Sequence, residues 1–149
     1  MIERWLLASL HLLALGIGLG AVIARGLALR SRLDRQALRG AFLADSVWGL
    51  AAFLWITTGL WRFLGGLEKD TGYYLASHVF LTKMALFLLV FALEIRPMRT
   101  LIAWRRQVAR GELPEAASGA TLARISFWQA GLVTVMVFLA AAMARGYGA

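Results

Sequence analysis

A lysine lies near the middle of a long apolar run in this chain. The run from Tyr73 to Leu93 surrounds Lys83 with apolar residues and is long enough to cross a bilayer as a helix. A lysine at the centre of a transmembrane helix is disfavoured by about 3 kcal/mol, and as a rule it faces a protein interior where it has a partner. Lys83 is therefore the first candidate for a catalytic residue.

The two histidines are the candidates for binding a cofactor. His11 is the seventh residue of the apolar run 5–24, and His78 is the sixth of the run that contains Lys83. At 1.5 Å per residue, both are expected about 7 to 9 Å below the same membrane surface. Two imidazoles at matched depth could bind haem b axially, or hold copper or another transition metal. Either His11 pairs with His78, or His11 faces Lys83 with His78 peripheral. Gly18, on the His11 side of its helix, would leave room for a flat ligand.

A polar stripe follows one face of the run 41–64. Its members alternate at spacings of three and four residues: Asp45, Trp48, Ala52, Trp55, Gly59 and Arg62. This is the helical period, so the stripe is expected to point into the protein. Asp45 and Arg62 are then candidate anchors for the charged groups of a cofactor, or the ends of a polar track. Alternatively, both reach the headgroup layers from near the helix ends.

The elements that would position these residues are transmembrane helices. The chain has 149 residues, 60% of them hydrophobic, and a mean hydropathy of +0.70, values above those of soluble domains. Four apolar runs have the length of a membrane span, at residues 5–24, 41–64, 73–94 and 125–143. We predict an all-α, four-helix transmembrane bundle that forms a single domain over residues 1–149. The first run is too long for a secretory signal and is expected to be retained.

Basic residues are distributed unequally between the two sides of such a bundle. Eleven of the sixteen lysines and arginines fall in the connections 25–40 and 95–124, and three fall in the other loop and the termini. The positive-inside rule predicts that both connections are cytoplasmic and that the N and C termini are outside. We expect a multi-pass protein of the bacterial inner membrane. The net charge of +8 then needs no nucleic-acid partner. The absence of cysteine excludes disulfides and thiolate metal sites.

The longer connection can take two forms. Between Pro97 and Pro114 it mixes apolar residues with arginines. It either continues the third helix into the cytoplasm or lies along the membrane surface as an amphipathic helix.

Short motifs carry a resemblance to known families. Leu10-His11 in a first helix, with Thr82-Lys83-Met84-Ala85-Leu86 in a third, resembles the membrane-bound bacterial protoporphyrinogen oxidase family, HemJ. In that family the histidine and lysine at these places are implicated in haem b binding and activity. The same pairing is similar to the membrane domain of the copper-resistance protein CopD. Nearly the whole chain resembles an uncharacterised bacterial family of predicted four-helix membrane proteins, through residues 7–15, 44–62, 83–87 and 143–146.

These observations favour a haem b binding membrane protein with a redox or quinone-linked role. His11 and Lys83 would line one pocket, with His78 near its mouth and Arg62 beside a haem propionate. One alternative is a non-catalytic accessory subunit of a larger membrane complex, and another is a small metal or proton-coupled transporter. The lipid bilayer is the expected surrounding, and small residues in the first helix favour a homodimer or a larger assembly.

Overall fold

Four long helices make up most of the structure, a computed structural model that describes residues 2–65 and 71–147. They are α1 (Ile2–Arg30), α2 (Arg35–Leu64), α4 (His78–Ala109) and α5 (Gly119–Ala144), with a short helix α3 (Thr71–Ala76) and a single 3-10 turn η1 (Ala116–Ser118). Each long helix is long and apolar enough to cross a membrane. The predicted all-α, four-helix transmembrane fold is confirmed.

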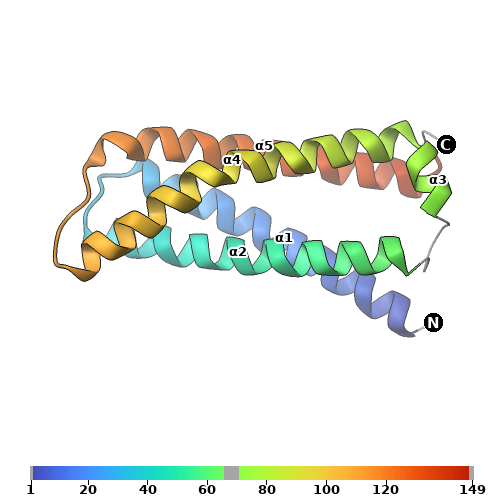
Figure 1. Cartoon of the computed structure of the whole chain (residues 1–149), viewed down its shortest axis with the longest axis horizontal. Helices are drawn as coiled ribbons and strands as arrows, with labels where there is room; N and C mark the ends of the chain where they lie inside the picture. Colours follow the sequence, from blue (N-terminus) through green and yellow to red (C-terminus); the bar gives the residue numbers. More distant parts are fainter. Residues whose placement is uncertain (1, 66–70, 148–149) are drawn as a thin grey trace.

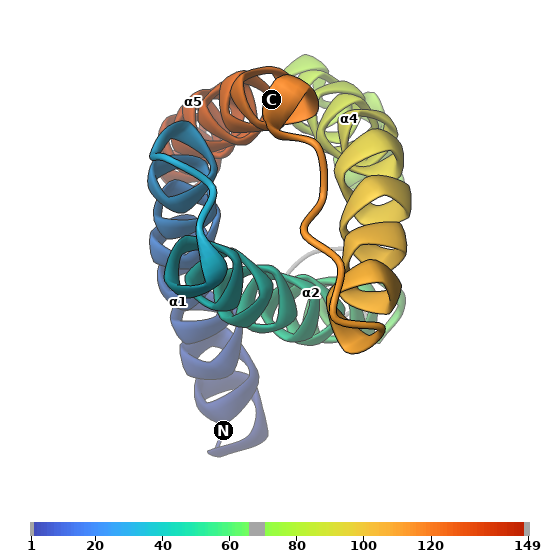
Figure 2. The same cartoon turned by 90° about the vertical axis from the view of Figure 1, so that its left-hand side faces the viewer.

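The long helices run alternately in opposite directions. The start of α1 and the end of α5 lie at one end of the bundle, and the α1–α2 and α4–α5 connections lie at the other (Figure 1). The positive-inside rule predicts that the end with the connections faces the cytoplasm. Helix α1 packs closely on α2 and α5, and α5 packs on α4, whereas the backbones of α2 and α4 come close at few points. Seen along its length, the bundle forms a ring of four long helices (Figure 2). Of the neighbouring helix pairs in this ring, α2 and α4 have the least closely packed backbones.

The first two helices extend beyond their apolar runs at the end of the bundle where α1 connects to α2. Because α1 continues to Arg30 and α2 begins at Arg35, the predicted loop 25–40 shrinks to residues 31–34. Asp34 caps α2 by accepting a hydrogen bond from the Ala37 backbone N–H at 2.8 Å. Hydropathy marks where a helix leaves the hydrocarbon layer, and arginine, a good helix former, continues the helix past that point.

The third predicted helix is both interrupted and extended. Ser77 breaks the run 73–94 and caps α4 through its side chain. Helix α4 then continues through Pro97 to Ala109, so much of the predicted connection 95–124 is helical. Of the two forms expected for this segment, the structure has the one that continues the third helix.

Two clusters of buried side chains hold the bundle together. The cluster nearer the α1–α2 and α4–α5 connections consists of Leu29, Leu38, Ala41, Leu101, Trp104, Leu122 and Ala123. The second consists of Ala21, Val22, Trp48, Val90, Ala130 and Val133. Gly18 lies beside the second cluster, where an added Cβ would be 3.3 Å from Ala51 Cβ and 3.5 Å from the Trp48 ring. Because it has no side chain, Gly18 allows α1 and α2 to pack closely together.

Candidate functional site

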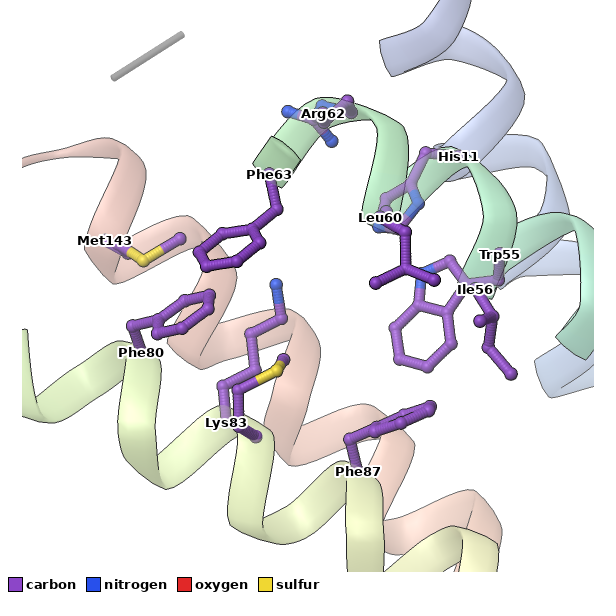
Figure 3. A pocket seen from close by; sticks show the side chains of 12 residues that line it. His11, Trp55, Ile56, Leu60, Arg62, Phe63, Phe80, Lys83, Phe87 and Met143 are labelled. Atoms are coloured by element: carbon purple, nitrogen blue, oxygen red, sulfur yellow. The ribbon is translucent and has the colours of Figure 1, made fainter. Parts of the chain in front are cut away.

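A cavity of about 390 Å³ lies toward the end of the bundle that holds the start of α1 and the end of α5. Helix α2 supplies one wall from within residues 55–63, and α4 supplies the facing wall from within residues 80–87 (Figure 3). His11 of α1 and Met143 of α5 also line it. All four long helices therefore contribute residues to the cavity. It lies between α2 and α4, whose contact, the α2–α4 seam, is the least closely packed in the bundle.

His11 is fixed in the lining by three neighbours on α2. Its Nδ1 lies 2.9 Å from the Thr58 hydroxyl oxygen, and its ring stacks on that of Trp55 with centroids 5.5 Å apart and an interplanar angle of 26°. Gly59 leaves space for the imidazole, because a Cβ at that position would lie 3.2 Å from His11 Cε1. The ring is therefore held by a hydrogen bond, a stacking contact and a position without a side chain.

Two cationic side chains share the lining with His11. Lys83 extends from α4 into the space between the two walls, and Arg62 lies near the end of α2 (Figure 3). The structure thus brings together in one cavity lining three of the residues selected from the sequence.

Aromatic rings form much of the remaining wall. The rings of Phe63 and Phe80 stack across the α2–α4 seam with centroids 5.5 Å apart, and Trp55 meets Phe87 edge to face at 5.7 Å. The Trp55 indole Nε1 is buried and has no hydrogen-bond partner among the described residues. A buried N–H without a partner is costly, so this donor suits a ligand that carries an acceptor.

Three other residues selected from the sequence lie outside the cavity lining. His78 is exposed as the first residue of α4, so the lining contains one histidine and not two. Gly18 packs between α1 and α2, as described above. Asp45 is 17 residues before Arg62 on α2, about 25 Å along the helix, so the two ends of the polar stripe cannot hold the same small cofactor.

Asp45 belongs instead to a buried charge network centred on Arg25, whose side chain is 0% exposed. The Arg25 guanidinium makes a bidentate pair with Glu94, at 2.7 and 2.9 Å, and a third ionic bond to Asp45 Oδ1 at 2.9 Å. Its other donors reach Ser126 Oγ at 3.1 Å and Gln129 Oε1 at 2.8 Å. All five guanidinium N–H groups are therefore used.

The network extends to a second arginine and joins all four long helices. Arg105 of α4 donates to Asp45 Oδ2 at 3.0 Å and to the Phe42 carbonyl oxygen at 2.7 Å. Gln129 donates to Glu94 Oε2 at 2.8 Å and to the Val90 carbonyl oxygen at 3.1 Å. With its donors and acceptors paired internally, the network has the character of a structural centre rather than a ligand site.

The network corrects one reading of the sequence. Arg25 was expected in a cytoplasmic loop, where it counted toward the positive-inside pattern, yet it is the most deeply buried charge described here. It follows the first apolar run directly, as Glu94 ends the third and Asp45 lies near the start of the second. The sequence feature that could have predicted the network is the presence of opposite charges at the same end of three spans.

No group of three or more histidine, cysteine, aspartate or glutamate side chains suited to a metal ion occurs in the part of the chain that the structure describes.

The fold and the cavity define a small four-span membrane protein with a basic, aromatic-walled pocket in one half of the bundle. A family model described as "Predicted membrane protein (DUF2214)" matches residues 3–148, and the chain belongs to this family. This confirms the resemblance to an uncharacterised family of four-helix membrane proteins. No curated protein matches the chain, and no solved structure does so.

Proposed function

We propose that this protein binds haem b in the cavity, where His11 would hold the iron, and that it serves a redox or quinone-linked reaction in the bacterial inner membrane. The observation that carries the proposal is that His11, Lys83 and Arg62 line one cavity whose walls are largely aromatic.

The residues present fit this group. A porphyrin is flat and largely apolar, with two carboxylates at one edge, and the aromatic side chains of α2 and α4 offer flat apolar walls. His11 offers an imidazole nitrogen, the commonest protein ligand of haem iron. Arg62 offers a cation that would pair with a carboxylate. Bound haem would supply one-electron chemistry.

Lys83 is the residue that we propose to act in catalysis. Its amino group extends into the cavity from α4, on the wall that faces Trp55 and His11 (Figure 3). An ammonium at this place can orient an anionic or carbonyl oxygen of a substrate and can donate a proton to it. A lipid-soluble reductant such as a quinol is the class of substrate that we propose. It could reach the cavity from the bilayer between α2 and α4, where the helices are least closely packed.

The small exposed glycines of α1 support an assembly as a homodimer or within a larger membrane complex. At Gly16 and Gly20 an added Cβ would meet nothing within 4 Å, so another helix could approach the backbone closely there.

Titration of the purified apoprotein with haem b tests the proposal, and the second histidine provides a matched control. Wild-type protein and His78→Ala are expected to bind one haem per chain, whereas His11→Ala loses binding. Lys83→Met should retain the bound haem and lose most of its reaction with a quinol.

The titration has two outcomes that would contradict the proposal. If His78→Ala lost haem as His11→Ala does, the cavity would not be the site. If wild-type protein bound no haem, the non-catalytic accessory-subunit reading would replace the redox role.

A further inference from the structure

We infer that Thr58 is a positioning residue for His11, which it holds in the tautomer whose Nε2 carries a lone pair toward a ligand. The inference rests on the proposed function, in which His11 binds the cofactor. Thr58 itself is buried behind the imidazole, on α2, and does not line the cavity.

The direction of the Thr58–His11 bond follows from the other bonds of the hydroxyl. Thr58 Oγ1 lies 2.7 Å from the Leu54 carbonyl oxygen and 3.2 Å from that of Trp55. Carbonyl oxygens only accept, so the single hydroxyl hydrogen is directed to them. With the hydrogen directed to the carbonyl oxygens, the hydroxyl oxygen accepts from His11 Nδ1 at 2.9 Å, and we infer that Nδ1 carries the proton.

The position of this proton determines what His11 can do. A neutral imidazole has one N–H, so a proton on Nδ1 leaves Nε2 as a bare nitrogen that can bind iron or accept a hydrogen bond. Histidines that bind metals nearly always donate their other ring N–H to an acceptor, which fixes the tautomer and the ring orientation and raises the basicity of the ligating nitrogen. Thr58 is such an acceptor, on a helix that also supplies the Trp55 stacking contact.

The neighbouring threonine shows what is particular about Thr58. Thr57 makes the same kind of local bond, donating to the Phe53 and Leu54 carbonyl oxygens at 2.9 and 3.1 Å. Its side chain is exposed, and the structure gives it no bond to an imidazole. Thr57→Val therefore removes an equivalent local bond from α2 without touching His11, and serves as the control for Thr58→Val.

Nitrogen-15 NMR of labelled histidine reads the tautomer directly in the apoprotein. We would use a His78→Gln background, so that His11 gives the only histidine signals, at mildly alkaline pH. Wild-type, Thr58→Ser and Thr57→Val proteins should carry the proton on Nδ1. Thr58→Val, similar in shape but without an acceptor, should move a large part of the population to the Nε2–H form.

Haem affinity of the same variants tests the consequence. Thr58→Val should bind haem b about 10- to 100-fold more weakly, the usual loss when a partner behind a metal ligand is removed. Thr58→Ser should recover most of the affinity, and Thr57→Val should match wild type.

The two measurements separate the possible failures. A proton on Nε2 in the wild-type apoprotein overturns the inference, whether or not haem binds. An unchanged haem affinity in Thr58→Val overturns the positioning role and leaves the proposed function standing. If no variant binds haem but the tautomer shifts as expected, Thr58 does position His11 and only the assigned cofactor is wrong.

Discussion

Replacing Arg25 with methionine should destabilise the bundle by about 3 to 5 kcal/mol, the usual cost of removing one partner from a buried ion pair. Arg25 is fully buried and makes its bidentate pair with Glu94. Asp45 keeps its bond to Arg105 when Arg25 is lost, whereas Glu94 keeps only the amide of Gln129 among its described partners. The uncompensated Glu94 charge is therefore the main source of the loss, which is large beside a typical stability of about 5 to 15 kcal/mol.

Two further variants separate charge from packing. Arg25→Met combined with Glu94→Gln removes the unpaired charge as well, and should recover at least half of the lost stability. Arg30→Met changes an exposed arginine on the same helix and should alter stability by no more than about 0.5 kcal/mol.

Equilibrium unfolding in a denaturing detergent, followed by helicity, measures these differences. If Arg25→Met were as stable as Arg30→Met, the buried network would not be a structural centre. The same reasoning would fail if adding Glu94→Gln lowered stability further.

Two other predictions concern the cavity and the topology. Gly59→Val should displace the His11 ring, since even a Cβ at residue 59 would lie 3.2 Å from it, and should weaken haem binding about tenfold or more. Gly49→Val, at a position where a Cβ meets nothing within 4 Å, should leave haem binding unchanged. Equal losses of haem affinity in the two variants would refute the proposed contact between residue 59 and His11. Reporters inserted at residues 31–34 or 112–113 should be cytoplasmic and one at the C terminus external, so a cytoplasmic C terminus would refute the orientation.

The number of helices could be predicted from the sequence, but their ends could not. Apolar runs report the part of a helix that lies in hydrocarbon. Helix α4 is longer than its run because the residues after Glu94 favour a helix with or without a membrane around them, and Pro97 fits into it without ending it. The break at Ser77 was missed because a capping serine is a small interruption in an otherwise apolar run.

Residues of the cavity could be predicted from their depth within the apolar runs, but those of the buried charge network could not. His11 and Lys83 could be selected because polar groups inside apolar runs are conspicuous. Arg25 stands at the edge of its run, where an interface arginine and a buried one have the same sequence pattern. Thr58 could not be recognised either, because threonine bonded to its own helix is common, and only the fold brings it within 2.9 Å of an imidazole.

The visible spectrum of the protein purified from cells with ample haem, first oxidised and then reduced, tests the haem site most directly. The wild-type protein is expected to show the bands of haem b, which sharpen on reduction, and His11→Ala purified in the same way is expected to lack them. A colourless wild-type protein, or an unchanged haem spectrum in His11→Ala, would contradict the assignment of the cavity as a haem site.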